Sequence, residues 1–213
     1  PGLQKELLKE IKKVNKNIVL VVMSGRPLDL TWEDENIPAI VQAWQLGSRS
    51  GDAIAQVLYG DYNPSGKLTM SFPRNVGQVP VYYNFKNTGR PSTSIEQVTN
   101  SGYADVENSP LYSFGYGLSY TEFKYSDFEI SSSNMTKDSK INASIRVTNT
   151  GKFKGEEVVQ LYLRDIVGSI ARPMKELKGF KKIELNPGES KIVNFEIENS
   201  LLEFYSYNNR SEE

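Results

Sequence analysis

The sequence predicts an incomplete α/β domain followed by an all-β sandwich, and three observations support this fold class. A continuous, largely β-branched run at residues 18–23 is typical of a strand buried on both faces of a parallel sheet. Helical periodicity precedes that run and returns after it. Beyond residue 120 the hydrophobic period changes to two, the period of half-buried antiparallel strands.

The first module is expected to follow the order helix, strand, strand, helix, strand. Apolar residues recur at three- and four-residue spacing between Leu3 and Val14, which predicts an amphipathic helix. The next elements are expected to be strands at 18–23 and 39–44, a helix at 52–59 and a strand at 67–72. Asp52 is the expected N-cap of the second helix. Three strands leave an open sheet edge, so we expect this module to be incomplete.

A long stretch without regular periodicity separates the two modules. It contains several prolines and many Asn, Ser and Thr residues. Loops of this length are usually functional or linking. We place the boundaries at residues 1–80 for the α/β part, 81–119 for the irregular connecting segment and 120–213 for the β-sandwich.

The second module shows strand periodicity with turn signals between the strands. Alternation of apolar and polar residues predicts strands near 141–148, 159–163, 177–185 and 193–197. Five or six strands are expected in all, whereas an immunoglobulin-like sandwich has about seven. Residues 208–213 show no strand pattern. The sandwich is therefore expected to lack its last strands.

The composition narrows the chemistry that the chain can perform. The formal net charge is -1 and the basic residues are scattered, which argues against binding to nucleic acid or a membrane surface. The chain has no histidine and no cysteine, which excludes Ser-His-Asp triads, Cys-His pairs and His or Cys metal ligation. We expect no cofactor and no metal. Carboxylates remain, and paired carboxylates are the usual equipment of glycosidases.

A series of short motifs carries a resemblance that no single one of them would support. The motifs are VMSGRP at 22–27, GDAIAQVLYGDYNPSGKL at 51–68, SFPR at 71–74, VPVYYN at 79–84, NTGRP at 87–91, FGYGLSYT at 114–121, VTNTG at 147–151 and LKGF at 177–180. In this order they resemble the carboxy-terminal half of glycoside hydrolase family 3, of the periplasmic β-glucosidase type. The resemblance covers nearly the whole chain.

The resemblance implies a three-part enzyme. A (β/α)8 barrel would carry a nucleophilic Asp, an α/β sandwich domain would carry an acid/base Glu, and a fibronectin type III-like β-sandwich would close the chain. Neither catalytic carboxylate matches a residue of this sequence, so no catalytic residue is expected here. The implied reaction is retaining hydrolysis of β-linked glucosides or oligosaccharides.

The resemblance also implies partners and a location. The substrate would be bound by the full-length enzyme, the missing N-terminal barrel domain would pack on this chain, and a homodimer is left open. Export to the periplasm or secretion is implied. The chain alone is expected to be inactive. The alternative is a freestanding accessory or interaction module derived from such an enzyme.

Asn87 and Arg90 are the candidate substrate-mouth residues. They lie in the irregular segment, and the resemblance implies that this stretch approaches the active-site mouth. Arg90 can donate paired hydrogen bonds to an acceptor, and Asn87 can donate to a sugar hydroxyl. The competing interpretation is that Arg90 only ties the loop to another domain.

An acidic cluster is the other candidate for chemistry. It consists of Asp29, Glu33, Asp34 and Glu35. A third hypothesis makes it the catalytic or metal-binding group of an autonomous enzyme. We favour a solvated charged face, which is the usual role of a charge run.

Four further features have structural interpretations that we favour over functional ones. Residues 24–27 follow a parallel strand, where ligands often bind, but they also read as a tight turn. Residues 47–51 lack the spacing of a nucleotide-binding loop. Four tyrosines are expected to pack at the domain junction rather than to stack on sugars, and Trp44 is expected in the core; the tyrosines are Tyr82, Tyr83, Tyr112 and Tyr116.

Overall fold

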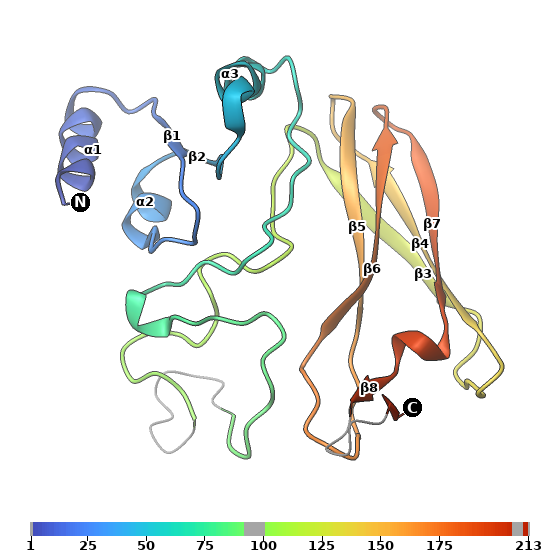
Figure 1. The fold of residues 1–213 in the computed structure, drawn as a ribbon. Coiled ribbons are helices and arrows are strands. Elements are labelled where there is room, and N and C mark those ends of the chain that lie inside the picture. The colour runs from blue at the N-terminus through green and yellow to red at the C-terminus, as the bar shows by residue number, and fades with distance from the viewer. Residues whose placement is uncertain (1, 92–100, 206–210, 213) are drawn as a thin grey trace.

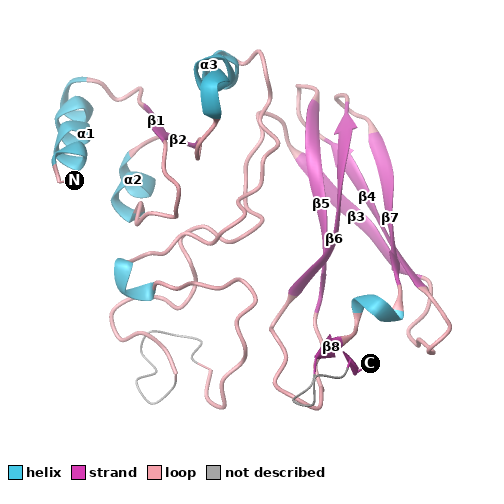
Figure 2. Cartoon of the chain, in the orientation of Figure 1, coloured by secondary structure: helices cyan, strands magenta, loops and turns pink. Residues whose placement is uncertain are grey.

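The computed structural model describes residues 2–91, 101–205 and 211–212 (Figure 1). Long strands make up the second module, whereas the first contains the three α-helices and extended irregular chain (Figure 2). The first module contains α1 (Leu3–Val14), β1 (Val19–Val22), α2 (Thr31–Asn36), β2 (Ala39–Gln42), η1 (Gly47–Arg49), α3 (Ser50–Tyr59) and η2 (Val76–Gln78). The second contains β3 (Phe123–Ile130), β4 (Ile141–Asn149), β5 (Gly155–Leu163), β6 (Glu176–Leu185), β7 (Ser190–Ile197), η3 (Asn199–Leu201), β8 (Phe204–Tyr205) and β9 (Ser211–Glu212).

Strands β1 and β2 pair in parallel, as their continuous apolar sequence indicates. Val19 is aligned with Ala39 and Val22 with Gln42. Val22 joins Leu30 and Phe72 in a small core, which partly buried neighbours such as Trp44 extend. Helix α1 contributes no buried residue to this core. The first module therefore buries its apolar residues around β1, β2 and the chain near Phe72.

Two predictions for the first module are wrong in detail. Helix α3 begins at Ser50, and Asp52 is not its N-cap but lies in its first turn, where it pairs with Arg49 Nε at 2.7 Å. Residues 67–72 do not form a strand. Leu68 and Phe72 each pair with residues between 111 and 116, but a bend at 69–70 separates the two pairings. The stretch predicted to be a strand is thus anchored at two separate points.

The second module is an antiparallel β-sandwich. One sheet has the order β3-β4-β7 and the other pairs β5 with β6. Alternate residues face inward and form a core of Val147, Val159, Leu185, Val193 and Phe195. The period-two prediction is confirmed. The expectation that no strand occurs at 208–213 is wrong, because β9 pairs with β8.

Polar contacts join the two modules. Lys67 Nζ forms an ion pair with Glu157 at 3.0 Å and donates to Gly117 O at 2.9 Å. Tyr125 Oη donates to Glu157 Oε1 at 2.8 Å. Burial, together with the Glu157 carboxylate, raises the pKa of Tyr125 above its ordinary value. Asn63 donates to Lys154 O at 3.0 Å from the loop after α3. These contacts hold the sandwich against the loop that follows α3.

Candidate functional site

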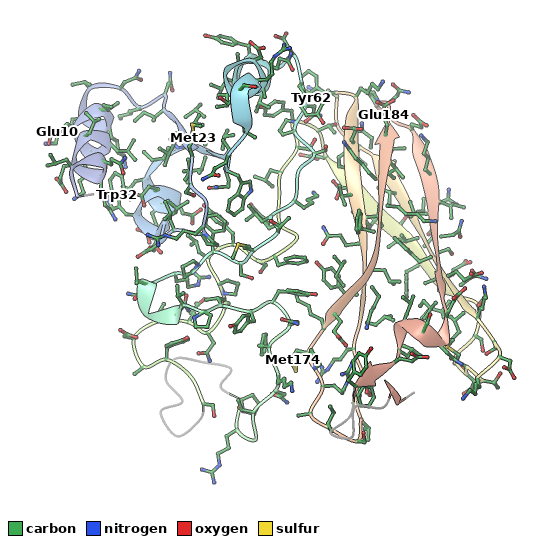
Figure 3. All side chains as sticks on the ribbon, viewed as in Figure 1. Glu10, Met23, Trp32, Tyr62, Met174 and Glu184 are labelled. Carbon is green, nitrogen blue, oxygen red and sulfur yellow. The ribbon has the colours of Figure 1, made fainter. Side chains whose placement is uncertain are left out.

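The segment at residues 81–91 lies against the start of β6. Phe85 O accepts a hydrogen bond from Met174 N at 2.8 Å, and Lys86 forms an isolated bridge with Pro173. Tyr83 Oη accepts from Leu177 N at 3.3 Å. Figure 3 shows Met174 where the sandwich faces the irregular segment. The segment is therefore attached to the sandwich, although it precedes the sandwich by many residues.

Aromatic packing fixes the beginning of this segment. The Tyr83 ring stacks on Phe114 with centroids 4.1 Å apart and meets the edge of Tyr162 at 6.3 Å. Burial raises the pKa of Tyr162, so its hydroxyl stays protonated and donates to Gln160 Oε1 at 2.5 Å. Stacked and edge-to-face rings hold a fixed geometry. The chain consequently leaves this cluster at a defined position before it reaches Asn87.

Asn87 and Arg90 both lie on the exposed part of the segment. Asn87 lines a groove of about 410 Å³ together with the loop between β5 and β6. Arg90 O accepts from Ser101 N at 2.7 Å. Neither side chain has a hydrogen bond to another described residue. The role of the two side chains at a substrate mouth stays a prediction.

The β5–β6 loop is the part of this groove that sequence reasoning missed. Residues 164–172 and Met174 line it opposite Asn87. Ile166 and Val167 in this loop are 81% and 89% exposed. Adjacent exposed apolar residues in a polar loop were the available signal, because large apolar side chains in water usually mark a contact surface. Nothing in the local pattern indicated that Asn87 lies beside them.

The acidic cluster is largely the solvated face that we predicted, because Asp29, Asp34 and Glu35 are exposed; Glu33 is the exception. It forms α2 and the turn before it, and Glu33 is only 8% exposed. Asp34 Oδ1 accepts a hydrogen bond from Tyr112 Oη at 2.5 Å. Burial and this carboxylate raise the pKa of Tyr112 above its ordinary value. In the described part of the chain, no group of three or more acidic side chains could hold a metal ion.

The other singled-out residues have structural roles. Ser24 Oγ donates to Arg26 O at 2.9 Å within the turn after β1. Residues 47–51 form η1 and the start of α3 rather than a phosphate loop. Trp44 packs on Phe72 at 5.8 Å, as expected of a core residue. The rings of Tyr112 and Tyr116 stack with their centroids 5.5 Å apart. Tyr82 does not pack as expected of the four tyrosines, because it is 64% exposed.

A second groove, of about 580 Å³, lies where the loop after α3 meets the ends of β5 and β6. Figure 3 shows Tyr62 and Glu184 on its two sides. Three of its four charged lining residues are paired: Lys154 contacts Glu184 at 2.8 Å, and Glu156 contacts Lys182 at 2.7 Å. The hydrogen bond from Lys182 lowers the pKa of Glu156. Paired charges make this groove part of the junction between the modules.

Fold and groove together define a two-module protein, an α/β part followed by a β-sandwich, in which the exposed Asn87 faces the β5–β6 loop. The family model described as glycosyl hydrolase family 3 C-terminal domain matches residues 1–120. A fibronectin type III-like domain model matches residues 157–212. The chain belongs to glycosyl hydrolase family 3, and it corresponds to the C-terminal portion of such enzymes.

Relatives of known name are several times longer than this chain. A periplasmic β-glucosidase of Salmonella typhimurium is 52% identical over 207 residues, which are 97% of this chain and 27% of that protein. A β-xylosidase of Formosa agariphila is 46% identical over 92% of this chain and 26% of its own length. The chain thus spans about a quarter of the length of these relatives.

Solved structures show the same arrangement of modules. A β-glucosidase from Listeria innocua, solved in complex with glucose, superposes with a TM-score of 0.91 at 38% identity. The match covers 100% of this chain and 30% of that chain. A second structure of that enzyme, a mutant, contains laminaribiose and has a TM-score of 0.92. No helix among the described residues is both long and apolar enough to cross a membrane.

Proposed function

We propose that this chain is the C-terminal portion of a retaining β-glucosidase-like enzyme that acts on β-linked glucosides or oligosaccharides. The observation that carries the proposal is the 52% identity to a β-glucosidase of which this chain spans 27%. In the proposed enzyme an Asp attacks the anomeric carbon, and a Glu protonates the leaving oxygen and then activates water. Both residues belong to the part of the enzyme that precedes this chain.

The surface of the first module supports a longer protein. The apolar stripe of α1 is exposed to solvent, and it consists of Leu3, Leu7, Ile11 and Val14. Strands β1 and β2 form a two-stranded parallel sheet in the described residues. Parallel sheets normally have both faces covered. This surface therefore suits burial by the upstream part of the same polypeptide.

Asn87 and Arg90 are proposed to contact the substrate at the mouth of the active site. Asn87 has an amide that donates to a sugar hydroxyl, and Arg90 has a planar fork of donors. Their exposure supports this role, as does the absence of a hydrogen bond from either side chain to another described residue. The name of the Salmonella relative supports a periplasmic location, and we propose that this enzyme is periplasmic or secreted.

The first test compares the pure chain with the native gene product. The mass of the native product should be several-fold above 24.0 kDa, and that product should hydrolyse an aryl β-glucoside. The 213-residue chain should show no turnover. Turnover by the chain alone would contradict the proposal. A native mass near 24.0 kDa would favour the freestanding accessory module instead.

The second test concerns the mouth. Asn87→Ala and Arg90→Ala in the full-length enzyme should each raise KM about three- to tenfold, the value of one hydrogen bond, with little change in kcat. Asn84→Ala, an exposed neighbour in the same segment, is the matched control. Unchanged KM in both variants would refute the mouth assignment and leave the family assignment intact.

A further inference from the structure

The loop between β5 and β6 is organised around one arginine. Arg172 Nη2 donates to Glu176 Oε2 at 2.8 Å, and Nε lies 3.6 Å from Asp165 Oδ2. The guanidinium carbon lies 4.2 Å from the centre of the Phe204 ring. The side chain is only 12% exposed. Arg172 therefore ties together the two ends of the loop and the strand β8.

The loop is folded tightly onto this side chain. A Cβ atom placed on Gly168 would come within 2.8 Å of both Arg172 Cγ and Asp165 Oδ2. Val167 N donates to Asp165 Oδ1 at 3.1 Å, which closes the turn at the loop's start. The loop thus packs so closely on Arg172 that residue 168 has no room for a side chain.

The residues that immediately follow Arg172 hold the candidate mouth segment. Pro173 bridges Lys86, and Met174 N donates to Phe85 O at 2.8 Å. Asn87 follows directly and lines the groove with the same loop. A shift of Arg172 therefore has a short route to Asn87, through backbone contacts rather than through flexible side chains.

We propose that Arg172 is a positioning residue that holds Asn87 in place for substrate, acting through residues 173–174 and 85–86. This inference rests on the proposed role of Asn87 at the mouth. Arginine suits this position, because its guanidinium donates to Glu176, lies 3.6 Å from the Asp165 carboxylate and stacks on Phe204. A lysine keeps the charge but cannot hold all three partners. The β-sandwich thereby takes part in substrate binding without touching the substrate.

The test uses the full-length enzyme with Arg172→Lys and Arg172→Met. Both should raise KM for an aryl β-glucoside about three- to tenfold, as Asn87→Ala does, with kcat changed less than about twofold. The double variant Arg172→Met/Asn87→Ala should have the KM of Asn87→Ala alone, because residues that act through one contact are not additive. Arg146→Met is the matched control. It removes an exposed ion pair with Asp127 on β3 and should leave KM unchanged.

A second measurement follows the hydrogen bond between Met174 N and Phe85 O. Hydrogen exchange in the peptide that contains Met174 should be faster in Arg172→Met than in the parent enzyme, because the bond to Phe85 O is weakened. A KM effect for Asn87→Ala without any for the two Arg172 variants would overturn the positioning role and leave the mouth intact. No effect of Asn87→Ala would overturn the mouth assignment, and the positioning role with it. If Arg172→Met does not fold, Arg172→Lys decides.

Discussion

At the scale of single residues, the contact between Lys67 and Glu157 is a shielded ion pair across the junction of the two modules. The two side chains are 15% and 10% exposed, so the pair is largely shielded from water. The remaining acceptor capacity of Glu157 is used by Tyr125, and Lys67 also donates to Gly117 O. A buried ion pair with its other polar atoms satisfied costs little, whereas a buried charge without its partner costs much.

Glu157→Gln should therefore destabilise the chain by about 3 kcal/mol, because it leaves the Lys67 ammonium buried without a counter-charge. Urea unfolding of the purified chain measures the change. Glu184→Gln is the control, since it breaks the exposed pair with Lys154 and should leave the unfolding curve unchanged within error. Equal effects of the two substitutions would show that the burial of Glu157 is unimportant.

At the scale of elements, helix α3 shows how the chain stops a helix. Gly60 follows Tyr59 with φ of 83°, in the left-handed region, and its N–H bonds to Val57 O. The chain then turns into the loop that meets the sandwich. A residue with a Cβ is strained in this conformation. Gly51 in the first turn of the same helix has no such need, and an added Cβ would meet nothing within 4 Å.

Gly60→Ala should destabilise the chain by about 1 to 2 kcal/mol, because it forces an alanine into the left-handed region. Gly51→Ala should instead stabilise it by up to about 1 kcal/mol, since alanine favours the helical backbone. Thermal or urea unfolding of the two variants distinguishes these effects. Destabilisation by Gly51→Ala of the same size would argue against the backbone explanation.

At the scale of the whole molecule, helix α1 stands out because its apolar side is exposed to solvent. It contacts α2 through three of its lysines. The ammonium groups of Lys5, Lys9 and Lys12 lie within 6 Å of the centre of the Trp32 ring on α2. Figure 3 shows Glu10 and Trp32 on this pair of helices. The polar side of α1 therefore packs on α2, whereas Leu7 in its apolar stripe is 62% exposed. An amphipathic helix normally buries its apolar side.

Leu7→Gln should change the stability of the 213-residue chain by less than about 0.5 kcal/mol, because the side chain is largely exposed. In the full-length enzyme the same substitution should cost about 2 kcal/mol, since the upstream polypeptide would bury Leu7. Glu10→Gln should be neutral in both. Unfolding curves of both proteins provide the comparison, and a neutral Leu7→Gln in the full-length enzyme would refute burial of this face.

Hydrophobic periodicity predicted those strands whose residue pattern is local to the strand itself. The alternation near 141–148 corresponds to β4, and the continuous apolar run at 18–23 contains β1. The stretch 67–72 failed because its partners lie some forty residues later and meet it only on either side of a bend. Of the candidate site, the resemblance suggested Asn87 and Arg90, whose role stays a prediction, whereas no local pattern placed the β5–β6 loop beside Asn87.

The sequence alone determined the fold class, the family, and the absence of histidine and cysteine chemistry. These depend on residue type and on short-range spacing. Only the tertiary structure decided which polar groups are buried, such as Glu33 and Glu157, and which distant segments touch. The bond between Leu177 and Tyr83 joins residues 94 positions apart. Such a contact exists because two modules pack together, and no periodicity within either module encodes it.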